Sequence, residues 1–332
     1  SGDFSELTNL TRLTLSDNQI SSIESGDFSG LTNLEDLDLG LNQISSIESA
    51  DFTGLPNLLH LDLGTNQISD IEPGAFSGCA NLKELNLGRT STLTELNLAK
   101  AVFLGLSMFE VDGNANITSV SLRNAEVNQA SFTTILDGGR YDGQEPCTGI
   151  GELPGITKMD LSGMDFADIT DLSPLYMMDD LTDLWLVDPV NLDATDLDAL
   201  LDNLETIEGT ETEGILYMTQ ADFDAFDTVG GGLLTAWNDE EGHHVEFLQV
   251  GDVNHDTGVN GLDVEPFLRV LLASRFDVAA DINEDGAVNG LDVTPFVATV
   301  LSGGAAVVPE PSTFALTTLA LLWLLCWRRK GL

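Results

Sequence analysis

Two short stretches toward the C-terminal end of the chain carry oxygen-bearing side chains at matched spacing. Positions 1, 3, 5 and 12 are Asp252, Asn254, Asp256 and Asp263 in the first stretch, and Asp281, Asn283, Asp285 and Asp292 in the second. Alternate side chains of a tight loop converge on one point, and Ca²⁺ prefers about six to eight oxygen ligands. We therefore predict that these eight residues bind calcium. Without a metal, their clustered oxygens would repel one another with no cation to offset the repulsion.

The elements that must position these loops are short helices. An apolar periodic segment follows each loop, containing Phe267, Val270 and Leu271 after the first, and Phe296, Val297 and Val300 after the second. Pro266 and Pro295 fall in the expected first helical turns, where a missing N–H costs little. The apolar eighth residues, Val259 and Val288, are expected to pair the two loops through a short strand.

This duplicated block, residues 250–303, resembles dockerin domains. The resemblance implies a small all-α calcium-binding module whose partner is a cohesin module, and Asp at position 12 fits it. Two departures stand out. Thr257 takes the position where a sharp turn favours Gly, so this turn is less favoured in the first loop. Positions 10 and 11, which dockerins use for partner choice, are Gly-Leu in both loops instead of a hydroxyl pair.

A second repeat occupies the N-terminal part, with a step of 24 residues. The pattern Leu-x-Leu recurs at Leu13, Leu37, Leu61 and Leu85, and Phe4, Phe28, Phe52 and Phe76 recur in step; Asn18, Asn42 and Asn66 follow the first three strands. Period-two alternation predicts short parallel strands with the leucines inward. We expect the asparagines to satisfy backbone groups from coil to coil, and stacking to bury one continuous core.

This pattern resembles the leucine-rich repeat family, which implies an α/β solenoid, a horseshoe, over residues 1–249. Repeats are regular over 1–90 and degenerate afterwards. Strands at Phe109 compete with strands at Leu96 and Val120, and the sequence leaves open which set faces the core. Later strands are expected at Met159–Leu161, Leu184–Leu186, Leu216–Met218 and Val245–Phe247, with an interrupting loop at 137–154. Cys79 occupies a leucine position, which favours a small core hydrophobe.

Outward positions of the regular strands form two columns of mostly polar residues. The columns are Arg12, Asp36, His60 and Glu84, then Thr14, Asp38, Asp62 and Asn86. In the leucine-rich repeat family this concave face commonly binds protein or glycan ligands. The alternative is that these residues only keep an open sheet soluble.

The C-terminal tail, residues 304–332, combines Pro309–Ser312, an apolar run at 314–327, and Arg328, Arg329 and Lys330. The run is shorter than the roughly 20 residues of a spanning helix. The arrangement resembles a PEP-CTERM sorting signal, which implies a C-terminal hydrophobic helix in the inner membrane, processing by an exosortase, and delivery to the cell surface or extracellular matrix. A retained membrane anchor is the alternative. The start at Ser1, within a repeat, suggests a fragment or processed form.

Composition limits the possible partners. The 332 residues include 12 Lys and Arg against 55 Asp and Glu, a net charge of −43. Such a chain repels nucleic acid. No nucleophile motif contains any of the four histidines, and no Gly-rich phosphate loop is present, so we expect no enzyme activity.

Together these features predict an exported surface or matrix protein that binds through its repeat face and carries a calcium-stabilised module. The rival hypothesis is a subunit of a polysaccharide-degrading complex, attached through cohesin–dockerin pairing. A hydrolase whose catalytic part precedes Ser1 is a third possibility.

Overall fold

A computed structural model provides the structure of the chain. It describes residues 4, 6–90, 92–139, 147–153, 155–172, 174–175, 178, 180–192, 197, 201, 214–230, 233–238, 243–247, 267, 280 and 293–302. The chain divides into two compact units, Ser1–Glu246 and Phe247–Leu332. The domain boundaries expected from the sequence, and the tail at 304–332, remain predictions.

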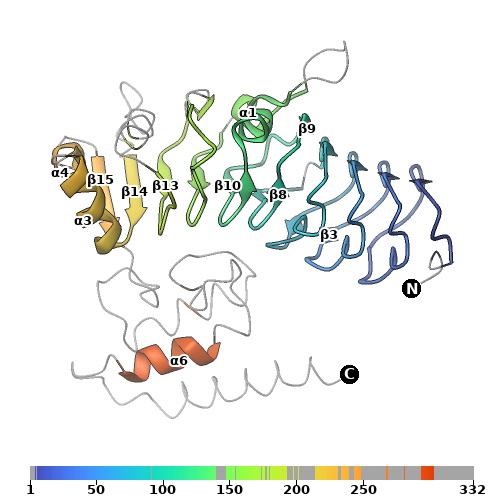
Figure 1. Ribbon diagram of the computed structural model, residues 1–332, viewed down its shortest axis with the longest axis horizontal. Helices are drawn as coiled ribbons and strands as arrows, with labels where there is room; N and C mark the ends of the chain where they lie inside the picture. Colours follow the sequence, from blue (N-terminus) through green and yellow to red (C-terminus); the bar gives the residue numbers. More distant parts are fainter. Residues whose placement is uncertain are drawn as a thin grey trace. The chain divides into compact units, whose positions relative to one another are not determined.

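The first unit is a stack of coils built around parallel strands (Figure 1). A first sheet has the order β1 (Arg12–Thr14), β2 (Asp36–Asp38), β4 (His60–Asp62), β6 (Glu84–Asn86) and β9 (Met108–Glu110). Each strand pairs with the next at an offset of 24 residues, as in Leu13 with Leu37 and Leu85 with Phe109. The central residue of each strand points into the core and its two neighbours point outward, as the Leu-x-Leu pattern predicts.

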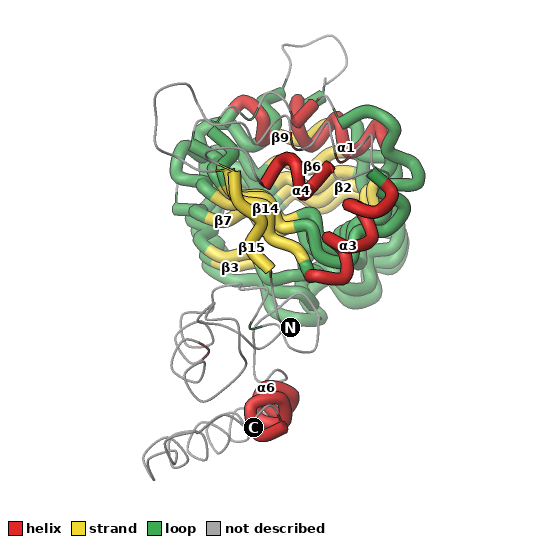
Figure 2. Tube along the Cα trace, turned by 90° about the vertical axis from the view of Figure 1, so that its left-hand side faces the viewer, coloured by secondary structure: helices red, strands yellow, loops and turns green. Residues whose placement is uncertain are grey.

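A second sheet lies on another side of the coils, and its first strand in the sequence follows β6. Its strands are β7 (Glu95–Asn97), β10 (Ser119–Ser121), β12 (Lys158–Asp160), β13 (Asp183–Trp185), β14 (Gly214–Met218) and β15 (His243–Phe247). β7 lies against β5 (Asp70–Ile71), which pairs with β3 (Ser46–Ile47). Figure 2 shows β3 and β7 on a different side from β2, β6 and β9. The two competing strand sets therefore both form, and both bury apolar residues.

Asparagine side chains connect the coils inside the turns that follow the first sheet. The Asn42 amide nitrogen donates to Leu15 O and Leu39 O, at 3.0 and 2.9 Å, and its oxygen accepts from Ile20 N at 3.0 Å. Asn66 repeats these bonds one coil later. Because buried backbone groups need partners, this ladder lets the strands turn away without unpaired carbonyls. The predicted ladder is confirmed.

A column of stacked phenylalanines also forms part of the core. The rings of Phe28 and Phe52 stack with centroids 6.4 Å apart, and those of Phe52 and Phe76 lie 6.2 Å apart. Phe103 continues the column beyond Phe76, in β8 (Val102–Phe103), which pairs with β11 (Glu126–Val127). Cys79 is fully buried in the same core, as predicted, and burial raises the pKa of its thiol to about 12.

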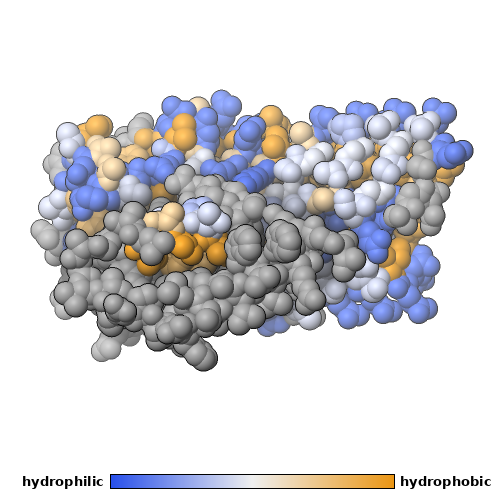
Figure 3. Space-filling view, turned by 90° about the horizontal axis from the view of Figure 1, so that it is seen from below, coloured by the Kyte–Doolittle hydropathy of each residue, from blue (hydrophilic) through white to orange (hydrophobic). Residues whose placement is uncertain are grey.

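Helices occur where the repeats become irregular. α1 (Gln129–Asp137) precedes the predicted loop, which contains a short 3₁₀ helix, η1 (Ile150–Glu152). α3 (Gln220–Val229) and α4 (Leu233–Asn238) lie between β14 and β15. No helix within the described part of the chain is long and apolar enough to cross a membrane. Hydrophilic side chains recur along the coils at the N-terminal end (Figure 3).

In the second unit, the structure describes Phe247, Phe267, Ala280 and residues 293–302. Phe267, Ala280 and α6 (Val293–Ser302) contribute buried residues, and Pro295 lies in the first turn of α6, as predicted. The rings of Phe267 and Phe296 stack, with centroids 3.9 Å apart and an angle of 6° between their planes. These two residues occupy equivalent positions in the duplicated motif, so the stack joins one residue of each copy. The all-α character of this unit remains a prediction.

Candidate functional site

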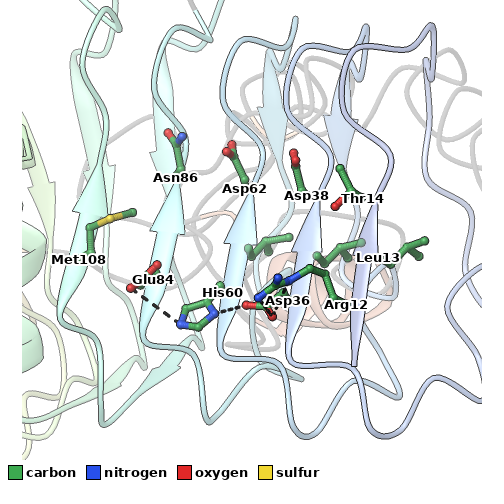
Figure 4. Close-up of a pocket in the computed structure, with 12 residues that line it drawn as sticks. Arg12, Leu13, Thr14, Asp36, Asp38, His60, Asp62, Glu84, Asn86 and Met108 are labelled. Carbon is green, nitrogen blue, oxygen red and sulfur yellow. Dashed lines mark hydrogen bonds and ion pairs between the residues drawn. The ribbon is translucent and has the colours of Figure 1, made fainter. Parts of the chain in front are cut away.

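The outward face of the first sheet carries a depression of about 290 Å³, lined by residues of all five strands. The strand register places Arg12, Asp36, His60, Glu84 and Met108 in one row. A second row runs beside it through Thr14, Asp38, Asp62, Asn86 and Glu110. Both columns expected from the sequence are therefore confirmed, and Figure 4 shows their side chains on the same face.

The first row is a chain of ionic contacts. The Arg12 guanidinium lies 3.0 Å from Asp36, and His60 Nδ1 contacts the other oxygen of the same carboxylate. His60 Nε2 lies 3.8 Å from Glu84 Oε1. Partial burial raises the pKa of Asp36, but hydrogen bonds from His60 and Arg12 outweigh it and hold that pKa below its usual value. Arg12 thus balances the charge of Asp36, and the His60 ring lies between Asp36 and Glu84.

The second row is held by bonds to the ends of its own strands. Asp38 Oδ1 accepts from Gly40 N at 3.1 Å, and Asp62 Oδ1 accepts from Gly64 N at 2.8 Å. Asn86 Oδ1 makes the same bond to Gly88 N at 2.8 Å. Because each bond closes a local turn, these side chains are fixed before any ligand arrives.

Glycines after the three middle strands, Gly40, Gly64 and Gly88, leave room for this row. A Cβ added at Gly40 would lie 3.2 Å from Asp62 Oδ1 and 3.4 Å from Asp38 Oδ1. Both carboxylates therefore flank the same glycine. Burial raises the pKa of Asp62, the Gly64 amide lowers it, and the charge of Asp38 raises it further.

The arrangement is suited to binding. In the depression, His60 contacts only carboxylates, and no serine or cysteine lines it. Ordered donors and acceptors, fixed on rigid strands, are what a recognition surface needs.

The eight predicted calcium ligands, Asp252, Asn254, Asp256, Asp263, Asp281, Asn283, Asp285 and Asp292, lie outside the described residues. Among the residues that the structure does describe, no group of three or more His, Cys, Asp and Glu is arranged to hold a metal ion. His244, on β15, lies 3.0 Å from Glu246.

Sequence reasoning missed an aromatic pair on the second sheet. Trp185 and Tyr217 stack at 4.3 Å with planes 3° apart, and Tyr217 donates to Asp183 Oδ1 at 3.0 Å. The Lys158 ammonium lies 5.9 Å from the centre of the Trp185 ring. The sequence could have predicted that both rings point outward, because each is the middle residue of an apolar-x-apolar strand.

Comparison with known families gives three descriptions. "Leucine rich repeat" matches residues 33–91 and 60–115, and "Leucine Rich repeats (2 copies)" matches residues 8–52. "Dockerin type I domain" matches residues 250–296. The chain contains leucine-rich repeats and a dockerin type I domain. The repeat matches cover the whole first sheet, and the dockerin match covers all eight predicted calcium ligands.

Whole-chain comparisons add little to these assignments. No curated protein matches the chain. Among solved structures, human 5T4 (Wnt-activated inhibitory factor 1, trophoblast glycoprotein) shares 19% identity over 64% of this chain and 69% of that chain, with a TM-score of 0.25. The leucine-rich repeats and the dockerin domain therefore each rest on their own family match and, for the repeats, on the coil geometry.

Proposed function

We propose that this protein is an exported, non-catalytic binding protein with two attachment devices. The first sheet of the leucine-rich repeats recognises a protein or glycan ligand, and the dockerin domain, stabilised by calcium, pairs with a cohesin-type module. The observation that carries the proposal is the depression on the first sheet, whose polar side chains are fixed by bonds within the fold.

Binding is favoured over a purely solubilising role by the rigidity of this face. A surface that only needs water contact gains nothing from ordered carboxylates that flank a glycine. Preorganised side chains instead reduce the entropy lost when a partner binds. The ion-paired row adds donors and acceptors in fixed positions, which favour one partner over others.

Calcium is proposed from the chemistry of the dockerin loops. Eight oxygen-bearing side chains at the EF-hand positions suit a hard cation, and Asp closes each loop at position 12. When bound, the ion offsets the repulsion of these carboxylates and so stabilises the domain. Gly-Leu at the partner-choice positions, in place of hydroxyls, points to an apolar contact with the cohesin-type partner.

Export is proposed from the tail. Pro309–Ser312, the apolar run and the basic end resemble a PEP-CTERM signal, which an exosortase recognises while the run lies in the membrane. The expected destination is the cell surface or extracellular matrix. Intact mass measurement of surface-extracted protein tests this step, because processing removes the basic end, whereas a retained anchor keeps it.

The central experiment is capture of the full-length protein on immobilised cohesin modules, in calcium and in EDTA. Calcium-dependent capture by at least one cohesin supports docking, and a matched chain with Asp263→Asn and Asp292→Asn should fail to bind. Absence of capture by a broad cohesin set would leave the repeat face as the sole attachment device and refute the docking half of the proposal.

A second candidate, a subunit of a polysaccharide-degrading complex, is favoured by the dockerin match at residues 250–296. In that case the repeats would position a protein or glycan beside enzymes that dock to the same scaffold. Co-purification with glycan-degrading enzymes on a cohesin-bearing scaffold, lost in EDTA, is the result that this candidate requires.

A further inference from the structure

We propose that the ligand of the first sheet is a protein with a basic segment, whose arginine or lysine side chain lies over Asp38 and Asp62 in the depression. This inference rests on the proposed function and names the chemistry of the partner. It follows from a difference between the two rows of side chains that line the depression.

The carboxylates of the first row already have side-chain partners within the row. Asp36 lies between Arg12 and His60, and His60 also faces Glu84. A partner that brought one charge to this row would have to displace an existing contact. The row therefore provides shape and orientation, and offers little net attraction.

The second row lacks such compensation. Asp38 accepts from the Ser16 hydroxyl at 2.7 Å and from Gly40 N, and Asp62 accepts from Gly64 N. Among the described residues, neither carboxylate forms an ion pair. Their bonds all come from neutral donors, so the two negative charges remain available to a cation from outside.

The two carboxylates are also held close together. Both Oδ1 atoms would contact the same added methyl group at Gly40. The charge of Asp38 and partial burial both raise the pKa of Asp62, so the free protein bears a cost for ionising this pair. A guanidinium or ammonium group between them would remove that cost, and it would meet carboxylates that need no reordering.

The two rows together disfavour a negatively charged partner. Five residues of the two rows are acidic, and Arg12 is the one Arg or Lys in them; the acidic residues are Asp36, Asp38, Asp62, Glu84 and Glu110. An acidic or phosphorylated segment would be repelled here, and a neutral apolar one would desolvate both carboxylates without replacing their water. Charge complementarity therefore favours a basic segment.

The test measures binding of a fluorescein-labelled tetra-arginine peptide to the full-length protein by fluorescence anisotropy at physiological ionic strength. The test variant is Asp38→Asn with Asp62→Asn. Asn86 already makes the strand-end bond in the same row, so asparagine keeps this geometry and removes only the charge. We expect roughly tenfold weaker binding, because a charge-assisted contact is lost.

The matched control is Glu126→Gln with Asp168→Asn, two exposed carboxylates outside the first sheet. It changes the net charge by the same amount, so general attraction to an acidic protein affects both variants equally. Less than a twofold change in the control, with the expected loss in the test variant, supports the site. Equal losses in both variants overturn it. Circular dichroism melting of both variants checks that each is folded, and the single variant Asp62→Asn replaces the double one if the double one is not.

Failure here is distinct from failure of the proposed function. If a natural protein partner is captured and Met108→Arg on the same face abolishes its binding while Asp38→Asn with Asp62→Asn does not, the recognition face stands and the basic-segment inference is wrong. If Met108→Arg also has no effect, the face itself is not used.

Discussion

Gly64 lies directly against Asn86 of the next coil. A Cβ at Gly64 would meet the Asn86 amide nitrogen at 2.8 Å and its oxygen at 3.0 Å. The amide cannot move freely, because its oxygen accepts from Gly88 N. The close approach between these coils therefore requires glycine at position 64.

Gly64→Ala is expected to destabilise the repeats by about 1–2 kcal/mol, because either the strand-end bond breaks or the coils separate. The measurement is urea unfolding of the full-length protein, followed by far-UV circular dichroism. Gly105→Ala is the matched control, since a Cβ there has nothing within 4 Å. Equal effects of the two substitutions would show that clearance at Gly64 is unimportant.

Leu41 combines exposure with a left-handed backbone. Its φ is 54°, and 55% of the residue is exposed. A left-handed conformation costs an ordinary residue roughly 1–2 kcal/mol, and asparagine tolerates it better. We expect Leu41→Asn to raise the free energy of unfolding by about 0.5–1 kcal/mol, measured in urea.

Leu104 provides the comparison for Leu41. It is 52% exposed and has no positive φ, so Leu104→Asn removes similar apolar surface without relieving strain. A change near zero is expected there. Stabilisation of the same size at both positions would mean that loss of exposed apolar surface, and not backbone strain, explains the effect.

The first sheet and its side-chain rows were predictable because their signals are local and repeat at one spacing. Leu13, Leu37 and Leu61 fix both the strand and its inward face, and the residues between them must then point outward. Asn42 was equally clear, since one buried amide per coil can serve only backbone groups. A single copy of any of these motifs would have been ambiguous.

The second sheet was not predictable to the same extent. Leu85 and Leu96 both lie in apolar-x-apolar segments of one coil, and a coil is long enough to hold a strand on each of two sides. Periodicity cannot rank two valid strands. The Trp185–Tyr217 stack depends on the register between β13 and β14, which an insertion of irregular length separates in the sequence.

Asp51 is a buried carboxylate in the first unit. It is 1% exposed; its Oδ2 accepts from Glu48 N at 2.8 Å, and its Oδ1 has no hydrogen-bond partner within the described structure. Burial raises its pKa from 3.8 to about 6, and the charges of Glu48, Glu72 and Asp27 contribute to the rise. The folded state therefore binds a proton more tightly than the unfolded state.

Stability should consequently fall as pH rises from about 4 to 6, because the folded protein loses the proton at a cost. Asp51→Asn removes this cost and is expected to stabilise the protein at pH 7, on the order of 1–2 kcal/mol. Urea unfolding of wild type and variant across this pH range measures it. Asp168→Asn, at an exposed carboxylate, should leave the pH profile unchanged, and so should Asp51→Asn if the burial argument is wrong.

The Phe267–Phe296 stack should depend on calcium. These two fully buried rings follow different loops of the duplicated motif in the sequence, so we expect their contact to require both halves to be folded. If each loop needs its cation to offset clustered carboxylates, chelation removes stabilisation of about 2.7 kcal/mol for calcium at a hundredfold excess over its dissociation constant.

We therefore expect EDTA to lower the melting temperature of the dockerin domain and to leave that of the leucine-rich repeats unchanged. Circular dichroism melting of the full-length protein should show one shifted and one constant transition. Asp263→Asn with Asp292→Asn should reproduce the shift in calcium, because each loop loses its closing carboxylate. Phe296→Ala should lower the melting temperature of the same transition in calcium, because it removes one ring of the stack. EDTA should still lower that melting temperature further, because the substitution removes no calcium ligand. If neither EDTA nor Asp263→Asn with Asp292→Asn changes either melting temperature, these loops fold without metal.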